Sequence, residues 1–206
     1  MSHHHTTAEH LRDALVHAFE ALSALPDDAA LARLAGRVDA VLRDRERLDA
    51  TASTLRRAVI RSRAHARVAD ATLDAAIAAF AADVLALGDA QSELYKRFFP
   101  EPHDEVIALG LESELPLVTL VLAHLGAQEL PASLARHADA LRAGLRLGNA
   151  ALANRSDALA DLGRHGAREE SWSESAASAL SSTRRSLEAL ARTRGLSSAW
   201  VAAFTS

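Results

Sequence analysis

The residues best suited to chemistry form an arginine-rich segment in the first half of the chain. Residues 54–67 contain no Asp or Glu. A phosphate-rich partner, such as a nucleic acid or an acidic lipid headgroup, could bind such a segment through ion pairs. No aromatic side chains alternate with the arginines to stack on bases, which argues against a nucleic acid as the partner. The segment is therefore either an anion contact or a solvated helix face; the candidate contacts are Arg56, Arg57, Arg61, Arg63 and Arg67.

Two pairs of carboxylates stand four residues apart, Asp70 with Asp74 and Asp157 with Asp161. This spacing places both members of a pair on one helix face. A di-iron helical bundle would also need Glu-x-x-His on two helices, a motif that this sequence lacks. We therefore interpret both pairs as solvated helix faces.

Histidines are the other possible metal ligands near the N-terminus. His10 and His17 would share a helix face, but they are two turns apart and too distant to hold one ion. His3, His4 and His5 precede them in a segment without apolar periodicity. We predict no metal site and no cofactor.

Motifs for covalent catalysis are also missing from the sequence. No glycine elbow surrounds any serine of the segment 171–182, and no glycine-rich phosphate loop is present. The absence of cysteine excludes disulfides and thiolate metal sites. We therefore expect a protein that is not an enzyme.

Aromatic side chains gather at two places. Tyr95, Phe98 and Phe99 stand just before Pro100, and a second group lies near the end of the sequence. Such residues could anchor a partner protein. Alternatively, the first group closes the end of a long helix against residues 115–126. The candidate partner anchors are Tyr95, Phe98, Phe99, Trp200 and Phe204.

Helices must position all of these residues. Aromatic residues make up only 4% of the chain, and apolar residues recur at heptad spacing over residues 27–98 without a proline. This pattern predicts one very long helix over about 27–98, capped by Asp27 and continuous through 49–54, where no Gly or Pro would form a turn. Arg45, Ser62 and Gln91 interrupt the apolar seam and could set its register.

Prolines 100 and 102 end that helix. We predict a short buried helical hub over about 103–126, with helices at about 103–111 and 115–126. A second arm follows Pro131, with a kink or break at Gly163 and Gly166. The fold class is therefore all-α, an elongated antiparallel helical bundle or coiled coil. We expect one domain over residues 1–206, with a faint internal duplication of 27–100 in 131–206 around the hub 101–130.

Complementary charges suggest a register for the two arms. An antiparallel pairing about the midpoints of the arms would place Arg67 by Asp157, Arg63 by Asp161, and Arg56 by Glu169. Exposed pairs of this kind contribute at most about 1 kcal/mol each, so they would select a register more than stabilise the fold.

Composition restricts the function classes further. The net charge of −4 does not draw the chain to anionic surfaces, and the longest apolar run, 116–125, is about half of a membrane span. No signal peptide is expected, and the excess of arginine over lysine indicates GC-rich bacterial coding. We expect an uncharacterised bacterial, cytoplasmic helical interaction or scaffold protein that binds a protein partner or itself through helical faces. The alternative is a binding module for an anionic polymer or a small apolar ligand.

Overall fold

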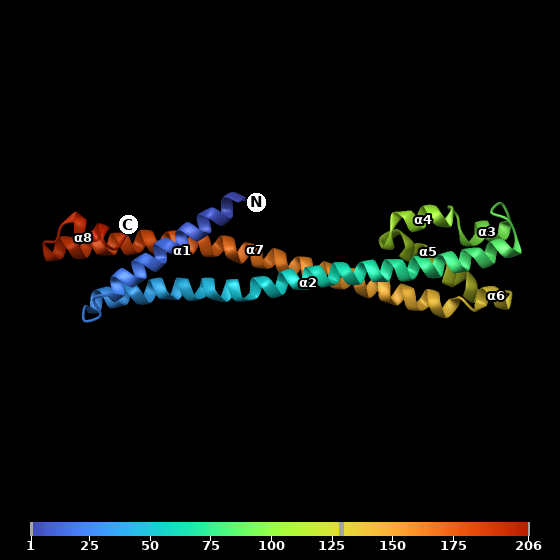
Figure 1. Cartoon of the computed structure of the whole chain (residues 1–206), viewed down its shortest axis with the longest axis horizontal. Helices are drawn as coiled ribbons and strands as arrows, with labels where there is room; N and C mark the ends of the chain where they lie inside the picture. Colours follow the sequence, from blue (N-terminus) through green and yellow to red (C-terminus); the bar gives the residue numbers. More distant parts are fainter. Residues whose placement is uncertain (1, 128–129, 206) are drawn as a thin grey trace. The chain divides into compact units, whose positions relative to one another are not determined.

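The computed structural model describes residues 2–127 and 130–205, and the side chains of residues 2–6 are not part of the description. His3, His4 and His5 therefore lie outside the described side chains. The all-α fold class is confirmed, since every regular element of the described residues is a helix (Figure 1). The helices are α1 (Ser2–Ser23), α2 (Ala29–Leu87), α3 (Glu93–Phe98), α4 (His103–Leu109), α5 (Leu111–Ala127), α6 (Ala132–Ala135), α7 (Ala138–Arg194) and α8 (Ser198–Ala202).

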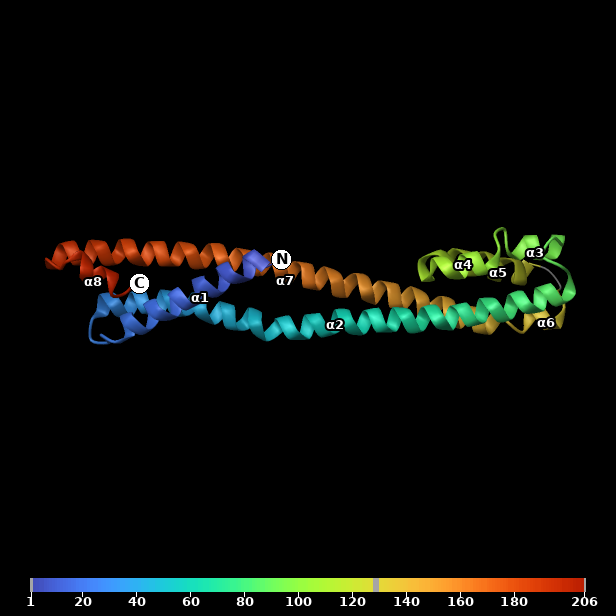
Figure 2. The ribbon, with the colours of Figure 1, turned by 45° about the horizontal axis from the view of Figure 1, so that its top comes forward.

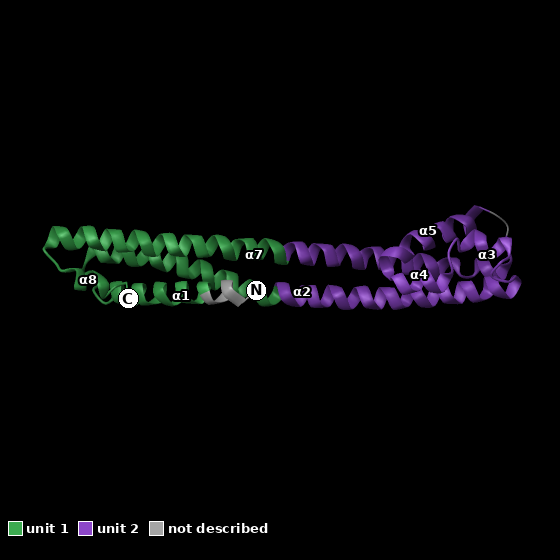
Figure 3. Cartoon of the chain, turned by 90° about the horizontal axis from the view of Figure 1, so that it is seen from above, with its two compact units in different colours: residues 1–54, 162–206 green, residues 55–161 purple. Residues whose placement is uncertain are grey.

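The chain forms two compact units (Figure 3). Unit 1 contains residues 1–54 and 162–206, and unit 2 contains residues 55–161. Within each unit, part of α2 packs antiparallel against part of α7 (Figures 1 and 2). Unit 1 adds α1 and α8 to this pair, and unit 2 adds α3, α4, α5 and α6.

The start of α2 is fixed by a side-chain cap. Oδ1 of Asp28 accepts hydrogen bonds from the backbone N–H groups of Ala30, at 3.0 Å, and Leu31, at 3.3 Å. Arg194 forms an ion pair with the same carboxylate and holds the pKa of Asp28 well below its usual value. The cap is therefore Asp28 and not the predicted Asp27. The continuity of the helix through 49–54 is confirmed.

The predicted helix over 27–98 is wrong at its C-terminal end. The structure ends α2 at Leu87 and begins α3 at Glu93. Ser92 caps α3 by accepting a hydrogen bond from the Tyr95 N–H at 3.2 Å. Gly88 and this cap supply the stop and start signals that the heptad pattern hides. Gln91 lies exposed in the turn, so it is not a seam residue.

The second long helix, α7, runs without the predicted break at 163–168. A Cβ added at Gly163 or Gly166 would meet no atom within 4 Å, so neither glycine marks a close contact. A glycine inside a helix costs only about 1 kcal/mol relative to alanine, and the good helix formers around these two outweigh that cost.

The two helices of the hub predicted at about 103–126 are confirmed as α4 and α5, but they are only partly buried, since Leu109 is 68% and Leu120 is 37% exposed. The second helix of the hub begins at Leu111 and not at about 115. Gly110 joins the two helices directly because its φ of 84° lies in the left-handed region, which glycine adopts without strain. Phe98 and Phe99 of the adjoining segment pack on Phe80 of α2, with ring centroids 5.0 and 5.8 Å apart.

Close packing sets the register of α2 and α7 in unit 2. A Cβ added at Gly144 of α7 would lie 2.6 Å from Cδ1 of Leu73 in α2, so a larger residue at this position would require the Leu73 side chain to shift. Further along, Asp83 of α2 lies 2.7 Å from Nε2 of His137 and 2.6 Å from Nη2 of Arg136. His137, and then Arg136, hold the pKa of Asp83 below its usual value.

The predicted charge register is wrong. In unit 1, Glu169 pairs with Arg45, with 3.6 Å between Oε1 and Nη2, and not with Arg56. Arg63 and Arg67 are exposed, and no ion pair of the described residues involves either of them. Exposed charges are too weak to outweigh the packing of buried residues such as Leu73.

No helix in the described part of the chain is both long enough and apolar enough to span a lipid bilayer.

Candidate functional site

Three carboxyl groups meet in unit 2 between α2 and α5. Asp70 and Asp74 come from α2 and Glu114 from the first turn of α5. Each offers an oxygen atom, and these three atoms all lie within 4.8 Å of one another. We call these residues the carboxylate cluster. Asp70 and Asp74 are half-buried, whereas Glu114 is 0% exposed.

The surrounding helices explain why Glu114 is held in this position. Its neighbours Leu111 and Leu115 lie against Gly148 of α7, where an added Cβ would be 2.9 Å from Leu111 Cδ1 and 2.7 Å from Leu115 Cδ2. The small residue thus lets α7 approach α5 closely. On the other side of the cluster, Leu73 contacts Gly144 of the same helix. Because α7 packs on both α2 and α5, it fixes the spacing across which the carboxyl groups face each other.

The buried oxygens of the cluster have no hydrogen-bond partner among the described residues. This holds for Oδ1 of Asp70, Oδ1 of Asp74, and both Oε1 and Oε2 of Glu114. Arg155, which forms an ion pair at the start of α5, engages Glu112 and not Glu114. Buried polar atoms are nearly always hydrogen-bonded, and a buried carboxylate without a partner is costly. As ionised groups, the three carboxylates therefore lack a partner, and either a proton on Glu114 shared with Asp74 or an added cation would supply one.

Burial and like charge also perturb ionisation in the cluster. Burial raises the pKa of Glu114 to about 9, and the neighbouring carboxylates of Asp74 and Asp70 contribute to the rise. With only protein groups around it, Glu114 therefore keeps its proton at neutral pH. Chemically, the cluster can hold either this proton or a cation in its place.

The interpretation of Asp70 and Asp74 as a solvated helix face is wrong. Both side chains turn a buried oxygen toward Glu114, which sequence analysis overlooked. A signal was present, because Glu114 occupies an apolar heptad position between Leu111 and Val118. The other pair, Asp157 with Asp161, is exposed as predicted.

The five candidate anion contacts, defined above as the arginines of residues 54–67, are all exposed on α2. In the part of the chain that the structure describes, none of them forms an ion pair or a side-chain hydrogen bond. The structure thus brings them together on one helix but supplies no internal acid for them.

The candidate partner anchors lie mostly inside the two units. Tyr95, Phe98 and Phe99 are buried in the core of unit 2, and Phe98 lies 6.0 Å from the His124 ring of α5. This is the helix-closing arrangement considered from the sequence. In unit 1, Trp200 packs edge-on against the buried Phe204 at 4.8 Å.

A polar layer interrupts the apolar core of unit 1, as the position of Arg45 in the seam predicted. The Arg45 guanidinium lies 2.8 Å from Oδ1 of Asp49 and 5.1 Å from the ring centroid of Trp172. Trp172 donates a hydrogen bond from Nε1 to the Val41 carbonyl at 2.8 Å. The buried His165 lies beside Glu169, which is also paired with Arg45. These contacts tie the register of α2 and α7 in this unit.

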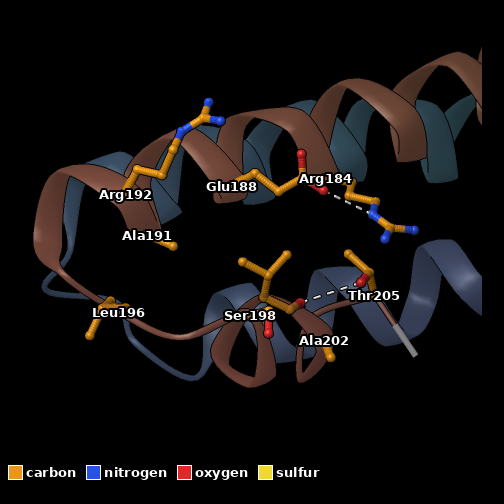
Figure 4. Close-up of a pocket in the computed structure, with 9 residues that line it drawn as sticks. Arg184, Glu188, Ala191, Arg192, Leu196, Ser198, Ala202 and Thr205 are labelled. Carbon is orange, nitrogen blue, oxygen red and sulfur yellow. Dashed lines mark hydrogen bonds and ion pairs between the residues drawn. The ribbon is translucent and has the colours of Figure 1, made fainter.

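Unit 1 also has an open groove of about 540 Å³ between the end of α7 and α8 (Figure 4). In Figure 4, the Glu188 side chain of α7 points toward Arg184, while Ser198 and Thr205 lie on the opposite side of the groove. Nε of Arg184 donates to Oε1 of Glu188 at 3.1 Å, so the charges of the groove pair with each other.

Comparison of this chain with protein-family models, with curated proteins and with solved structures finds no match to any of them. The roles considered for the carboxylate cluster, the arginines and the helix faces rest on their geometry and chemistry.

Proposed function

We propose that this chain is a non-enzymatic helical interaction protein that self-associates through the outer face of α2 in unit 2. One observation carries the proposal. A second apolar stripe, distinct from the buried one, follows this face, and all of its members are exposed. We call it the outer stripe: Ile60, Ala64, Val68, Ala71, Ala75, Ala78, Ala82 and Leu85.

The spacing and exposure of the outer stripe support a helical partner. Its members recur every three or four residues, which is the spacing of a coiled-coil seam. Ile60 is 66% exposed and Val68 is 62% exposed, although both are β-branched residues that favour burial. Alanine at most of the other positions would let a second helix approach closely. A continuous apolar stripe of this kind is typical of a protein–protein contact.

Charge along the same segment favours a second copy of this chain as the partner. Residues 54–67 carry five arginines and no acid, whereas residues 68–95 carry five acids and no lysine or arginine. Two copies packed antiparallel about the middle of the outer stripe would place each basic end beside the acidic end of the other. A two-fold symmetric dimer needs this self-complementarity.

The same proposal includes the compartment. A chain without cysteine and rich in arginine is consistent with the cytoplasm of a bacterial cell. Dimerisation there would present a continuous coiled-coil surface for further helical partners.

Sedimentation equilibrium over a range of protein concentrations tests the proposal. We expect the unaltered chain to dimerise, with a dissociation constant that rises with salt because charge pairs are screened. The double variant Ile60→Glu with Val68→Glu should weaken dimerisation at least about tenfold, since it places acids in the apolar contact. Leu147→Glu is the matched control, because Leu147 is 45% exposed but lies on α7.

Two results would overturn the proposal. One is a chain that remains monomeric at every concentration and at low salt. The other is a dimer that the Ile60 and Val68 substitutions leave as tight as the Leu147 control. Circular dichroism would verify that each variant keeps its helical content.

A second candidate function is binding of an anionic polymer by α2. The observation that favours it is the set of five exposed arginines without an internal partner. Titration with polyphosphate at two salt concentrations would show steep salt dependence if these arginines contact phosphates. Arg57→Gln with Arg61→Gln should then reduce both the affinity and the salt slope. Absence of binding at low salt would eliminate this candidate.

A further inference from the structure

The carboxylate cluster lies apart from the outer stripe and calls for its own explanation. Four buried carboxyl oxygens of Asp70, Asp74 and Glu114 lack a hydrogen-bond donor among the described residues. Glu114 is fully buried, and its oxygen lies within 4.8 Å of an oxygen of each aspartate. Its position between Leu111 and Leu115, which pack against α7, keeps it from turning out to solvent. A buried carboxylate held in this way toward two others is costly unless it is protonated or has a positive partner.

We infer that Asp70, Asp74 and Glu114 bind a divalent cation that prefers oxygen ligands, of the class of Mg²⁺, Mn²⁺ and Ca²⁺. Carboxylate oxygens are the usual protein ligands of these hard cations. The set contains no histidine, cysteine or methionine, so it does not suit a soft metal.

The geometry suits partial coordination by the protein. Three carboxylates from two helices supply one ligand atom each on one side of the ion. Asp70 and Asp74 are only half-buried, so water can reach the other side and complete the coordination shell. Spacing of four residues puts both aspartates on one face of α2, and the turn at Gly110 brings the start of α5 beside them. The bound ion would therefore tie α5 to α2 within unit 2.

A purely structural account competes with this inference. Glu114 could remain protonated and share its proton with Asp74, in which case no ion is needed. The two accounts predict different effects on metal binding when Glu114 is replaced by glutamine, a neutral side chain of the same shape. Glu114→Gln removes the ionisable group in either case, but only a cation site then loses affinity for a metal ion.

Isothermal titration calorimetry on the full chain, treated first with a chelator that is then removed, distinguishes them. Mn²⁺, Mg²⁺ and Ca²⁺ are titrated separately, and we expect one saturable site per chain for at least one of them. Glu114→Gln and Asp74→Asn should each weaken binding at least about tenfold. Asp157→Asn is the matched control, since Asp157 belongs to a carboxylate pair of the same spacing that is exposed.

Thermal unfolding supplies a second readout on the same samples. The ion should raise the melting temperature of the unaltered chain and of Asp157→Asn, because ligands that bind only the folded state stabilise it. Glu114→Gln should fold and melt at the same temperature with and without the ion. The inference is overturned if none of the three ions binds saturably, or if Glu114→Gln binds and is stabilised as strongly as the control.

Discussion

The contact of Gly144 with Leu73 provides a direct test of how closely α7 must approach α2. A Cβ at position 144 would lie 2.6 Å from Cδ1 of Leu73 and 3.7 Å from its Cα. Leu73 is fully buried, so its side chain has little room to move away. Gly163 lies in the same helix but would place its Cβ within 4 Å of no atom. Gly144→Ala and Gly163→Ala are thus the same change in two different environments.

The two variants should change the free energy of unfolding in opposite directions. Replacing glycine by alanine inside a helix stabilises by about 0.5–1 kcal/mol, because alanine loses less conformational entropy on folding. An extra methyl group in a well-packed core costs about 1–3 kcal/mol. At Gly163 only the first effect acts, so the variant should be more stable by about 0.5–1 kcal/mol. At Gly144 the second effect is larger, and we expect a net loss of about 1 kcal/mol.

Urea unfolding followed by circular dichroism measures both changes. The comparison depends on the difference between the two variants, which does not require the absolute stability of the chain. A further change, Gly144→Val, should cost more than Gly144→Ala because it adds bulk to the same contact. If Gly144→Ala stabilises the protein as much as Gly163→Ala does, then Leu73 yields easily and the close approach of α7 to α2 does not set the register.

The remaining predictions concern pH. In the unfolded, chelator-treated protein, Glu114 ionises near its ordinary pKa of 4.5. In the folded protein, burial and the nearby aspartates raise its pKa to about 9. The free energy of unfolding should therefore fall as pH rises between these two values. From pH 5 to 8 the free energy of unfolding should fall by up to about 4 kcal/mol, and by less because water at the half-exposed aspartates screens the charge. Urea unfolding at several pH values measures this fall. Glu114→Gln should remove the pH dependence. Asp28 has the opposite effect on stability, because Arg194 lowers its pKa. Its contribution to the free energy of unfolding is present above about pH 4 and is lost as pH falls. Asp28→Asn should therefore reduce stability at pH 7 and reduce it less near pH 2, and equal destabilisation at both pH values would contradict the assigned role of the ion pair.

Local information was enough to predict the helices and their buried faces. The recurrence of Leu73, Ile77 and Phe80 at three- and four-residue steps predicted a buried stripe, and all three are buried. The absence of Gly and Pro from 49–54 likewise predicted a continuous helix. These features depend on neighbours within one or two turns of the same helix, so the sequence of a single segment is enough to predict them.

Two local features were misjudged although their signals were present. Gly88 and the Ser92 cap end one helix and begin the next, but the apolar pattern continues across them and hides the break. Gly163 and Gly166 resemble a break but lie inside α7. In both cases the apolar periodicity and the glycine or capping signals predict different helix ends. Which helix end forms depends on the packing energy of the folded helix.

The sequence by itself determined an all-helical chain with continuous apolar seams, because helix propensity and heptad spacing act within each segment. Only the tertiary structure decided which residues face each other across helices. Close packing of Leu73 on Gly144 overrides the register suggested by exposed charges, since those charges are screened by water. The packing of α7 on both α2 and α5 also brings the half-buried Asp70 and Asp74 to face the buried Glu114. Burial of a carboxyl group is a property of the assembled helices, and for this reason no single segment reveals it.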